Sequence, residues 1–526
     1  MKANLMFPDR DFDPKVALPP QAPLLVKDLE LEVLFAAMAA DDPFLLEVVK
    51  PGVLIGLDTP EGIRYRQDVL RDCIEHPGVV RQLYELAVEA LARERKVWGW
   101  STMRASPEAS LHRSRDVLEI FFDVLKRLRR LADTQATTFR SSGFSTLFQL
   151  LMTELNDDYL AEVADHLERF RFEHELVMSA KLGVTNEGVH YVLRRPLRRR
   201  TWWERLRAWR TRNGRGDPPS YTFEIHERDE QGFRALGELR GRGLDRVANA
   251  LAQSADHLLA FFKMLRTELA FFIGALNLRD RLLAKGERIS FPEPLPFGAA
   301  RLTTRGLCDV ALSLTAPQVV VANDLEGDEK LLIVITGANR GGKSTFLRGL
   351  GQAQLMMQCG LFVCAEGFRA NLCHGVFTHF KREEDATMTS GKLDEELHRM
   401  SSIVDQAECG SVLLCNESFG STNEREGSEI ARQVVGALLE EGVKVLYVTH
   451  MYELAHGLWV KGMRSALFLR AERLPDGTRT FRIREGEPLE TSYGEDLYRR
   501  IFGRVLESAA DTRASPIVPG TEARAP

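Results

Sequence analysis

Residues 337–344, GANRGGKS, carry the residue types and the spacing that hold phosphate groups. They match the pattern G-x-x-x-x-G-K-[ST] at every fixed position, between an apolar run at 331–335 and a helical segment from Thr345. In this strand–loop–helix context the glycines let main-chain N–H groups face phosphates, and the helix N-terminus adds a positive dipole end. Lys343 is placed to contact the β- and γ-phosphates, and Ser344 to hold Mg²⁺. The segment therefore predicts a nucleotide-binding P-loop.

A P-loop needs a second strand that brings an acidic side chain to the magnesium ion and the attacking water. The apolar run SVLLC at 411–415 fits this strand and ends in Asn416 and Glu417. Most P-loop ATPases have an aspartate followed by a glutamate here. Asn416 offers Mg²⁺ a carbonyl oxygen without negative charge, and Glu417 is the expected general base or water-orienting group. The apolar run at 444–448 is followed closely by His450, which we expect to contact the γ-phosphate.

The sequence patterns around these residues predict two kinds of domain. Residues 29–136 and 141–171 have mostly helical patterns, and apolar residues recur three or four apart from about 242 to 285. A helix over that last stretch would be roughly 60 Å long at 1.5 Å per residue, either a lever or a helix buried in a large bundle. Strands and helices alternate over 300–505, as in an α/β domain. The predicted fold class is a multidomain protein, with an all-α lever and core followed by an α/β P-loop domain.

Changes in composition give the expected boundaries. We expect an extended, proline-rich N-terminal arm, a helical core and lever domain with a small, partly β insertion, a P-loop domain that starts at the helix-breaking FPEPLP segment, and a disordered tail. Within the insertion, alternating apolar residues predict a hairpin around 185–188 and a strand at 220–226. These regions are, in order, residues 1–28, residues 29–290 with the insertion at about 176–228, residues 291–507 and residues 508–526.

Length and composition fit a protein with sizeable cores in a reducing compartment. The chain has 526 residues, of which 44% are hydrophobic and 28% charged, and its net charge is −5, so affinity for nucleic acid must come from a local patch. Its seven cysteines form no C-x-x-C motif, so neither a disulfide framework nor a zinc site is predicted. The N-terminus has no apolar signal segment and no stretch reads as a membrane span, so we expect a cytoplasmic protein.

Residues 194–216 are rich in arginine and tryptophan. They hold ten arginines, a single acidic residue and three tryptophans. Arginines can neutralise phosphates and tryptophans can stack on bases. Two other interpretations stay open, a helix packed on its own domain with a solvated basic face, and a helix that binds a membrane surface or a protein partner. The candidate DNA-binding residues are Arg198, Arg199, Arg200, Trp202, Trp203 and Arg207.

Several motifs together resemble the MutS mismatch-repair family. In chain order they are VVVAND (319–324), TGANRGGKST (336–345), LLCNESFGSTNEREG (413–427), YVTHMYELA (447–455) and TSYGEDLYRRIFG (491–503). The resemblance extends upstream to LDTPEGIRYRQDVL (57–70) and to ALNLRDRLL (275–283), at the end of the expected long helix. It covers roughly residues 30 to 505, and its ATPase motifs are highly specific.

The resemblance implies a fold, cofactors, partners and roles. The P-loop domain would be an ABC-like ATPase that binds ATP and Mg²⁺ and pairs two nucleotide sites across a homodimer. Catalytic residues would be Glu417, Lys343 and His450, and Ser344 and Asn416 would support the metal. The nucleotide phosphates would be held by Gly337, Asn339, Gly341, Gly342, Lys343, Ser344 and Thr345.

Three departures from the family pattern shape the expected function. The resemblance begins near residue 30, where the lever starts, so we expect a member without the mismatch-reading and connector domains. Residues 390–394, SGKLD, lack the second serine of the family's Ser-Gly-x-Ser-Thr motif, and Asn416 replaces an acid.

Two functional hypotheses remain. The first is an ATP-dependent DNA-binding protein of repair or recombination, in which ATP binding and hydrolysis switch a dimeric clamp on DNA without the usual mismatch recognition; a variant of it is a factor specific for branched DNA. The second is a nucleotide-gated dimeric scaffold that binds protein partners.

Overall fold

The computed structural model describes residues 1–98, 107–171, 177–184, 188–194, 224–226, 228–298, 300–382 and 391–490. The chain forms two compact units. One contains residues 1–4 and 78–269, and the other contains residues 5–77 and 270–526. No helix of the described residues is long and apolar enough to cross a membrane.

The first unit is mainly helical. Its helices are α5 (Pro77–Trp98), α6 (Pro107–Gln135), α7 (Ser142–Glu154), α8 (Asp157–Arg169) and the part of α10 (Glu230–Ala284) up to Leu269. The rings of Phe121 on α6 and Phe262 on α10 lie 5.0 Å apart between centroids, within a core of buried leucines and phenylalanines. The strands β1 (Val177–Leu182) and β2 (Gly188–Arg194) pair antiparallel, which confirms the predicted hairpin.

The long helix is longer than its sequence pattern predicted. It has 55 residues and begins at Glu230, not near residue 242. Glycines at 232, 237, 241 and 243 obscured this first part. Each glycine costs a helix only about 1 kcal/mol relative to alanine, and the intervening Glu, Arg, Ala and Leu residues are good helix formers. Of the strand predicted at 220–226, residues 224–226 are not in a strand and residues 220–223 lie outside the described part of the chain.

The N-terminal segment of the second unit is helical from Ala22, so the predicted extended arm fits residues 1–21, which contain no helix or strand, but not residues 22–28. It contains α1 (Ala22–Asp28), α2 (Leu31–Ala39), α3 (Pro43–Leu54) and α4 (Pro60–Glu75). Leu5 and Met6 are buried, because apolar residues among the prolines find a core to enter. Helix α4 starts as predicted, with the Thr59 side chain accepting a hydrogen bond from the main-chain N–H of Gly62.

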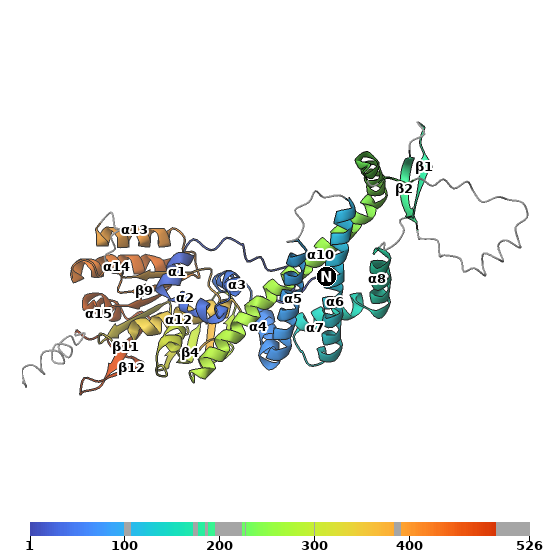
Figure 1. Cartoon of the computed structure of the whole chain (residues 1–526). Helices are drawn as coiled ribbons and strands as arrows, with labels where there is room; N and C mark the ends of the chain where they lie inside the picture. The colour runs from blue at the N-terminus through green and yellow to red at the C-terminus, as the bar shows by residue number, and fades with distance from the viewer. Residues whose placement is uncertain are drawn as a thin grey trace, which may run out of the picture. The chain divides into compact units, whose positions relative to one another are not determined.

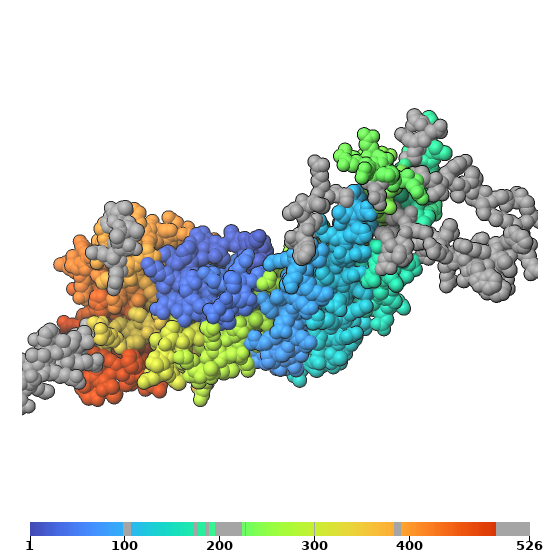
Figure 2. Space-filling model, in the orientation of Figure 1, coloured from blue at the N-terminus to red at the C-terminus, as the bar shows by residue number. Residues whose placement is uncertain are grey.

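This segment packs on the α/β part of the same unit. The side-chain amide of Gln352 donates to the carbonyl oxygen of Leu29 at 2.9 Å, and the N–H of Leu57 donates to the carbonyl oxygen of Gln358 at 2.8 Å. In the space-filling view its blue surface lies directly against the orange surface of the C-terminal part (Figure 2). Residues 29–77, which the sequence analysis grouped with the lever, therefore belong to the compact unit that contains residues 337–344.

The centre of the second unit is a six-stranded sheet in the order β12-β11-β6-β10-β9-β8. All neighbouring strands are parallel except the edge pair of β11 and β12. The strands are β6 (Leu332–Gly337), β8 (Val376–Phe380), β9 (Val412–Asn416), β10 (Lys444–Val448), β11 (Ala466–Arg473) and β12 (Arg479–Glu485). Every residue of β6 and of β10 is buried, as expected for parallel strands covered on both faces.

Helices cover both faces of this sheet (Figure 1). Successive side chains of a strand point to opposite faces. One set, which includes Val334, Leu413 and Tyr447, packs in a core with apolar residues of three helices. These helices are α13 (Lys392–Val404), α14 (Glu424–Glu440) and α15 (Tyr452–Val460). On the other face, Gly351 of α12 (Lys343–Gln358) lies so close to Leu414 that a Cβ at Gly351 would come within 2.5 Å of the Leu414 side chain.

A second, four-stranded sheet lies in the same unit, in the order β3-β7-β4-β5. Its strands are β3 (Glu293–Leu295), β4 (Leu302–Leu307), β5 (Asn323–Glu326) and β7 (Gly367–Asn371). The short helix α11 (Val310–Thr315) follows β4, and the Asp309 carboxylate caps its N-terminus. This sheet and α11 bring the segment 307–323 next to the P-loop helix.

Candidate nucleotide-binding site

The segment between β6 and α12 is where the sequence predicts a phosphate-binding loop, and it turns sharply at two glycines. Gly337 and Gly342 have φ angles of +106° and +90°, which an L side chain rarely adopts. The Lys343 side chain is buried and folds over the loop. Its ammonium donates to the carbonyl oxygens of Gly337 at 2.9 Å and Ala338 at 3.1 Å. Burial lowers the pKa of Lys343, and the negative charge of Glu417 acts against that shift.

Two oxygen atoms lie side by side where the sequence placed the metal ligands. The Ser344 hydroxyl donates to the side-chain oxygen of Asn416 at 2.8 Å. Adjacent ligands of an octahedral Mg²⁺ ion are about 2.9 Å apart when the metal–oxygen bonds are about 2.0–2.1 Å. The spacing of this pair therefore fits two neighbouring positions of a magnesium shell. The remaining positions would be filled by phosphate oxygens and water, as Mg²⁺ prefers.

Glu417 and His450 follow neighbouring parallel strands. The N–H of Glu417 donates to the carbonyl oxygen of Val448, which ties the end of β9 to the end of β10. The Glu417 carboxylate lies 3.6 Å from Nδ1 of His450. The His450 side chain beside it lowers the pKa of Glu417, against the effect of burial, and the positive charge of Lys343 contributes in the same direction. Glu417 is therefore ionised at neutral pH and can accept a proton.

A buried polar network fixes the residue after Glu417. The ring nitrogens of His379 lie 2.7 Å from the Ser418 hydroxyl and 3.0 Å from the carbonyl oxygen of Glu396. The Tyr447 hydroxyl donates to the carbonyl oxygen of Ser418 at 2.8 Å. Burial, together with the charge of Arg399, lowers the pKa of His379 to about 4, so its ring is neutral. The network holds the backbone at Ser418 on both sides, which keeps Glu417 directed at the P-loop.

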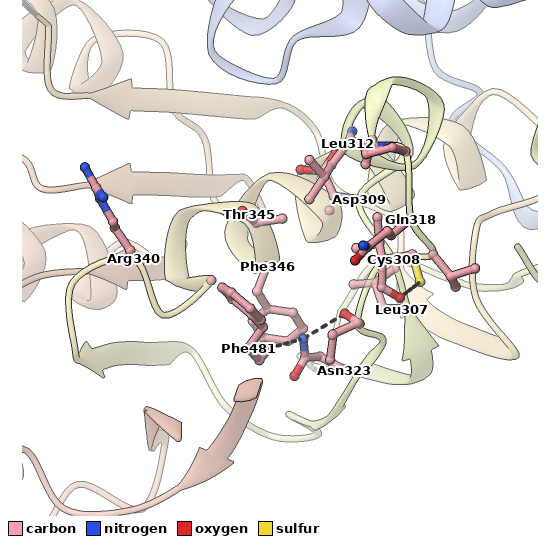
Figure 3. Close-up of a pocket in the computed structure, with 17 residues that line it drawn as sticks. Leu307, Cys308, Asp309, Leu312, Gln318, Asn323, Arg340, Thr345, Phe346 and Phe481 are labelled. Carbon is pink, nitrogen blue, oxygen red and sulfur yellow. Dashed lines mark hydrogen bonds between the residues drawn. The ribbon is translucent and has the colours of Figure 1, made fainter. Parts of the chain in front are cut away.

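A pocket of about 440 Å³ borders the start of α12 (Figure 3). Gly342, Thr345 and Phe346 form one wall, and the segment between β4 and β5 forms the opposite wall. The Asn323 side chain donates to the carbonyl oxygen of Phe481 at 3.1 Å, which joins β5 to β12 at the pocket. Most of the lining is apolar. The Arg340 side chain points away from the other labelled residues in Figure 3.

The structure brings together every residue that the sequence assigned to the nucleotide. They lie at the carboxyl ends of β6, β9 and β10, where ligands bind in parallel α/β sheets. Asn339 is exposed, and its carbonyl oxygen accepts a 3.4 Å hydrogen bond from Arg479. The roles themselves remain predictions. The candidate DNA-binding residues lie outside the described part of the chain, as does Ser390 of the SGKLD segment.

Sequence reasoning missed several residues around the site. Asn323 stands in VVVAND, a quoted family motif, but the motif gave no contact for it. Ser418 directly follows Glu417, and its hydroxyl could have been suspected from that position. Phe481 lies far along the chain in an edge strand, and its sequence context carries no signal for a role at the pocket.

Comparison with known proteins gives two family matches. Residues 58–285 match the model of the MutS2 N-terminal domain, and residues 333–497 match the model of MutS domain V. Each model therefore falls on one of the two regions that carry the sequence resemblance.

Curated relatives carry one printed name, Endonuclease MutS2. The protein from Streptococcus thermophilus is 33% identical over 196 residues, which is 36% of this chain and 24% of the relative. The protein from Thermomicrobium roseum is 28% identical over 246 residues, which is 44% of this chain and 30% of the relative. The chain thus covers less than a third of the length of these relatives. The two family models, matched in order on the helical region and on the P-loop region, show that the chain belongs to the MutS family.

Proposed function

We propose that this chain is an ATP-driven switch that binds and hydrolyses Mg²⁺-ATP at the loop between β6 and α12. One observation carries the proposal. The carboxyl ends of three adjacent parallel strands converge on a buried lysine, an oxygen pair with magnesium spacing and an ionised carboxylate. These are the groups that phosphoryl transfer to water requires. The family match supports the same conclusion, because domain V covers all three strands.

Each side chain has a distinct part in the proposed reaction. The Lys343 ammonium exchanges its hydrogen bonds with the carbonyl oxygens of Gly337 and Ala338 for contacts with the β- and γ-phosphates. Ser344 and Asn416 would hold Mg²⁺, which when bound neutralises charge on the phosphates. Glu417 takes a proton from the water that attacks the γ-phosphorus, while the bond to the bridging oxygen breaks and ADP leaves. His450 contacts the γ-phosphate and stabilises the ionised form of Glu417.

The pocket next to the loop accommodates the base of the nucleotide. Its apolar walls suit the faces of an adenine ring, and Thr345 and Phe346 connect it to the phosphate end of the site. Asn323 holds the two strands that frame the opening, through its bond to Phe481 and through a 2.7 Å bond that it accepts from the N–H of Ile483.

We further propose that two copies pair through their ATPase domains and that ATP binding changes the grip of the helical unit on DNA. Support comes from the family assignment and from the MutS2 N-terminal match over the helical region. A ligand shifts such an equilibrium only by its difference in affinity for the two states. Nucleotide must therefore bind the paired state more tightly than the separate chains.

Glu417→Gln tests the catalytic assignment, with Glu440→Gln as a matched control at an exposed glutamate near the end of α14. Glutamine keeps the shape of the side chain but cannot accept the proton. We expect ATP binding to persist and hydrolysis to fall about 10²–10⁴-fold, the usual contribution of a general base. Wild-type hydrolysis by the Glu417→Gln chain would exclude the assignment.

A binding panel tests the proposed DNA partner. The full chain is titrated onto homoduplex, mismatched duplex and a four-way junction, with ATP and without it, and its oligomeric state is measured in parallel. We expect ATP to change both the oligomeric state and the DNA affinity. If ATP drives pairing while affinity for every DNA stays unchanged, the switch acts on protein partners instead.

A further inference from the structure

Two cysteines and a glutamate form a buried cluster outside the phosphate loop. The Sγ atoms of Cys308 and Cys364 and a carboxylate oxygen of Glu287 all lie within 4.8 Å of one another. The three side chains are between 1% and 6% exposed. Among the described residues this is the one group of three or more His, Cys, Asp or Glu side chains whose ligand atoms lie close enough to share a metal ion.

The three side chains come from three segments that main-chain bonds hold together. Gly286, with a φ angle of +80°, ends α10, and the N–H of Glu287 turns back to the carbonyl oxygen of Leu282. The N–H of Cys308 donates to the carbonyl oxygen of Cys364 at 2.9 Å. These bonds place the cluster without help from the side chains, so the site is formed in advance of any ligand.

Further bonds hold the segments on either side of the cluster. Ser290 and Val363, which follow Glu287 and precede Cys364, exchange two main-chain hydrogen bonds of 2.9 and 3.1 Å. The Glu287 carboxylate accepts a 3.2 Å bond from the N–H of Val320. The bond from Val320 orients the Glu287 carboxylate, as hydrogen-bond partners outside the coordination shell orient metal ligands.

The charges of the cluster favour a cation. Two thiolates and a carboxylate would carry three negative charges on atoms within 4.8 Å of one another, and a divalent ion would offset them. The two thiol protons go to solvent when the ion binds.

We propose that Glu287, Cys308 and Cys364 bind a thiophilic divalent metal ion, zinc being the best fit. Thiolates select soft and borderline ions, and a carboxylate with two thiolates is a donor set that zinc accepts. Zinc–sulfur bonds of about 2.3 Å place two thiolates about 3.8 Å apart in a tetrahedron, so the two sulfur atoms need to close by about 1 Å at most.

The cluster borders the pocket at the start of α12 through Cys308. Cys308 and Val320 both line it, and Figure 3 shows the Cys308 sulfur among the labelled lining residues. Water or a small ligand could reach the ion from there. Cys308 also directly precedes Asp309, the cap of α11, so a bound ion would stiffen this wall of the pocket. The proposal does not depend on the identity of the nucleotide or on its hydrolysis.

Cobalt(II) is the probe for the test, because thiolate ligation gives it charge-transfer absorption that carboxylate or imidazole ligation does not. Untagged full-length chain, freed of metal with a chelator and kept reduced, is titrated with Co²⁺ and then with Zn²⁺. We expect one equivalent of Co²⁺ to produce the thiolate bands and Zn²⁺ to abolish them. Bands that are absent at one equivalent overturn the proposal.

Variants locate the site. Cys308→Ser and Cys364→Ser should each lose the bands, and Glu287→Gln, which keeps both thiols, should weaken Co²⁺ binding by at least roughly tenfold. Cys409→Ser is the control, because Cys409 is an exposed cysteine. Circular dichroism of the metal-free chains confirms that each variant is folded. Folded Cys308→Ser and Cys364→Ser chains that bind Co²⁺ with unchanged bands would refute the assignment, as would a Glu287→Gln chain with wild-type affinity.

Discussion

Gly337→Ala is a sharp test of how the phosphate loop is built. Gly337 ends β6 opposite Ala471 of β11, and its φ angle is +106°. A Cβ at this position would lie 2.9 Å from the main-chain nitrogen of Ala471 and 3.1 Å from its oxygen. Both are backbone atoms of a paired strand, so they cannot rotate away. The substitution must change the φ angle or push β11 from β6.

The expected cost follows from these two effects. A non-glycine residue in a sparsely populated backbone region costs about 1–3 kcal/mol. Overfilling a packed contact costs typically about 1–3 kcal/mol more. Together they predict a loss of about 2–6 kcal/mol in the free energy of unfolding of the P-loop unit. Because the carbonyl oxygen of Gly337 accepts a bond from Lys343, ATP binding should weaken as well.

The matched control is Gly436→Ala. Gly436 lies inside α14, and a Cβ there would meet no atom within 4 Å. Alanine should therefore stabilise the chain by about 0.5–1 kcal/mol through helix propensity. Urea unfolding followed by circular dichroism measures both variants. The reasoning fails if Gly337→Ala unfolds within about 0.5 kcal/mol of the parent chain, or if Gly436→Ala is destabilised.

Three further predictions follow from the same unit. His450→Asn removes the side chain that lowers the pKa of Glu417, so the acidic limb of the ATPase pH profile should move to higher pH, and a limb that does not move would contradict the pairing. Burial lowers the pKa of His379 to about 4 in the folded chain, against about 6.5 in the unfolded chain, so between these pH values only the unfolded chain binds a proton there. The free energy of unfolding should therefore fall by about 3 kcal/mol as the pH drops from about 6.5 to 4. His379→Asn should remove most of that pH dependence in urea titrations. Arg66 is 1% exposed and donates to two buried carbonyl oxygens, so Arg66→Met should destabilise the unit by about 3–6 kcal/mol in urea unfolding, and a change below 1 kcal/mol would show that those bonds contribute little.

The parts of the fold that were predictable are those governed by local pattern. The run at 331–335 is apolar and β-branched because β6 is buried on both faces, and the glycines that follow are required by the positive φ angles of the loop. Thr59 predicts the start of α4, because its hydroxyl accepts a hydrogen bond from a free main-chain N–H of the first turn, where a proline and a glutamate follow. Each of these signals depends on neighbours in sequence, which one chain displays directly.

What escaped prediction depends on contacts between distant segments. The proline-rich N-terminus looked extended, yet α1 forms and Leu5 is buried because a surface of the α/β unit covers that segment. The cysteines at 308 and 364 showed no metal-binding spacing, because folding and not sequence brings them to Glu287. Neither outcome has a local signature.

The position of Asn416 connects the two kinds of information. The sequence has an amide, Asn416, where most P-loop ATPases have an acid. From the sequence we predicted that this amide can still offer an oxygen to Mg²⁺. In the structure its side-chain oxygen accepts a bond from the Ser344 hydroxyl at the spacing of two magnesium ligands. In the proposed metal site the amide would therefore supply a ligand oxygen at the right spacing without supplying charge. Glu417, whose pKa is lowered by the adjacent His450 side chain, is then a source of negative charge at this end of the sheet. The switch is consequently expected to depend on Glu417 for electrostatics as well as for proton transfer, so Glu417→Gln should raise the Mg²⁺ concentration needed for tight ATP binding while Glu440→Gln leaves it unchanged.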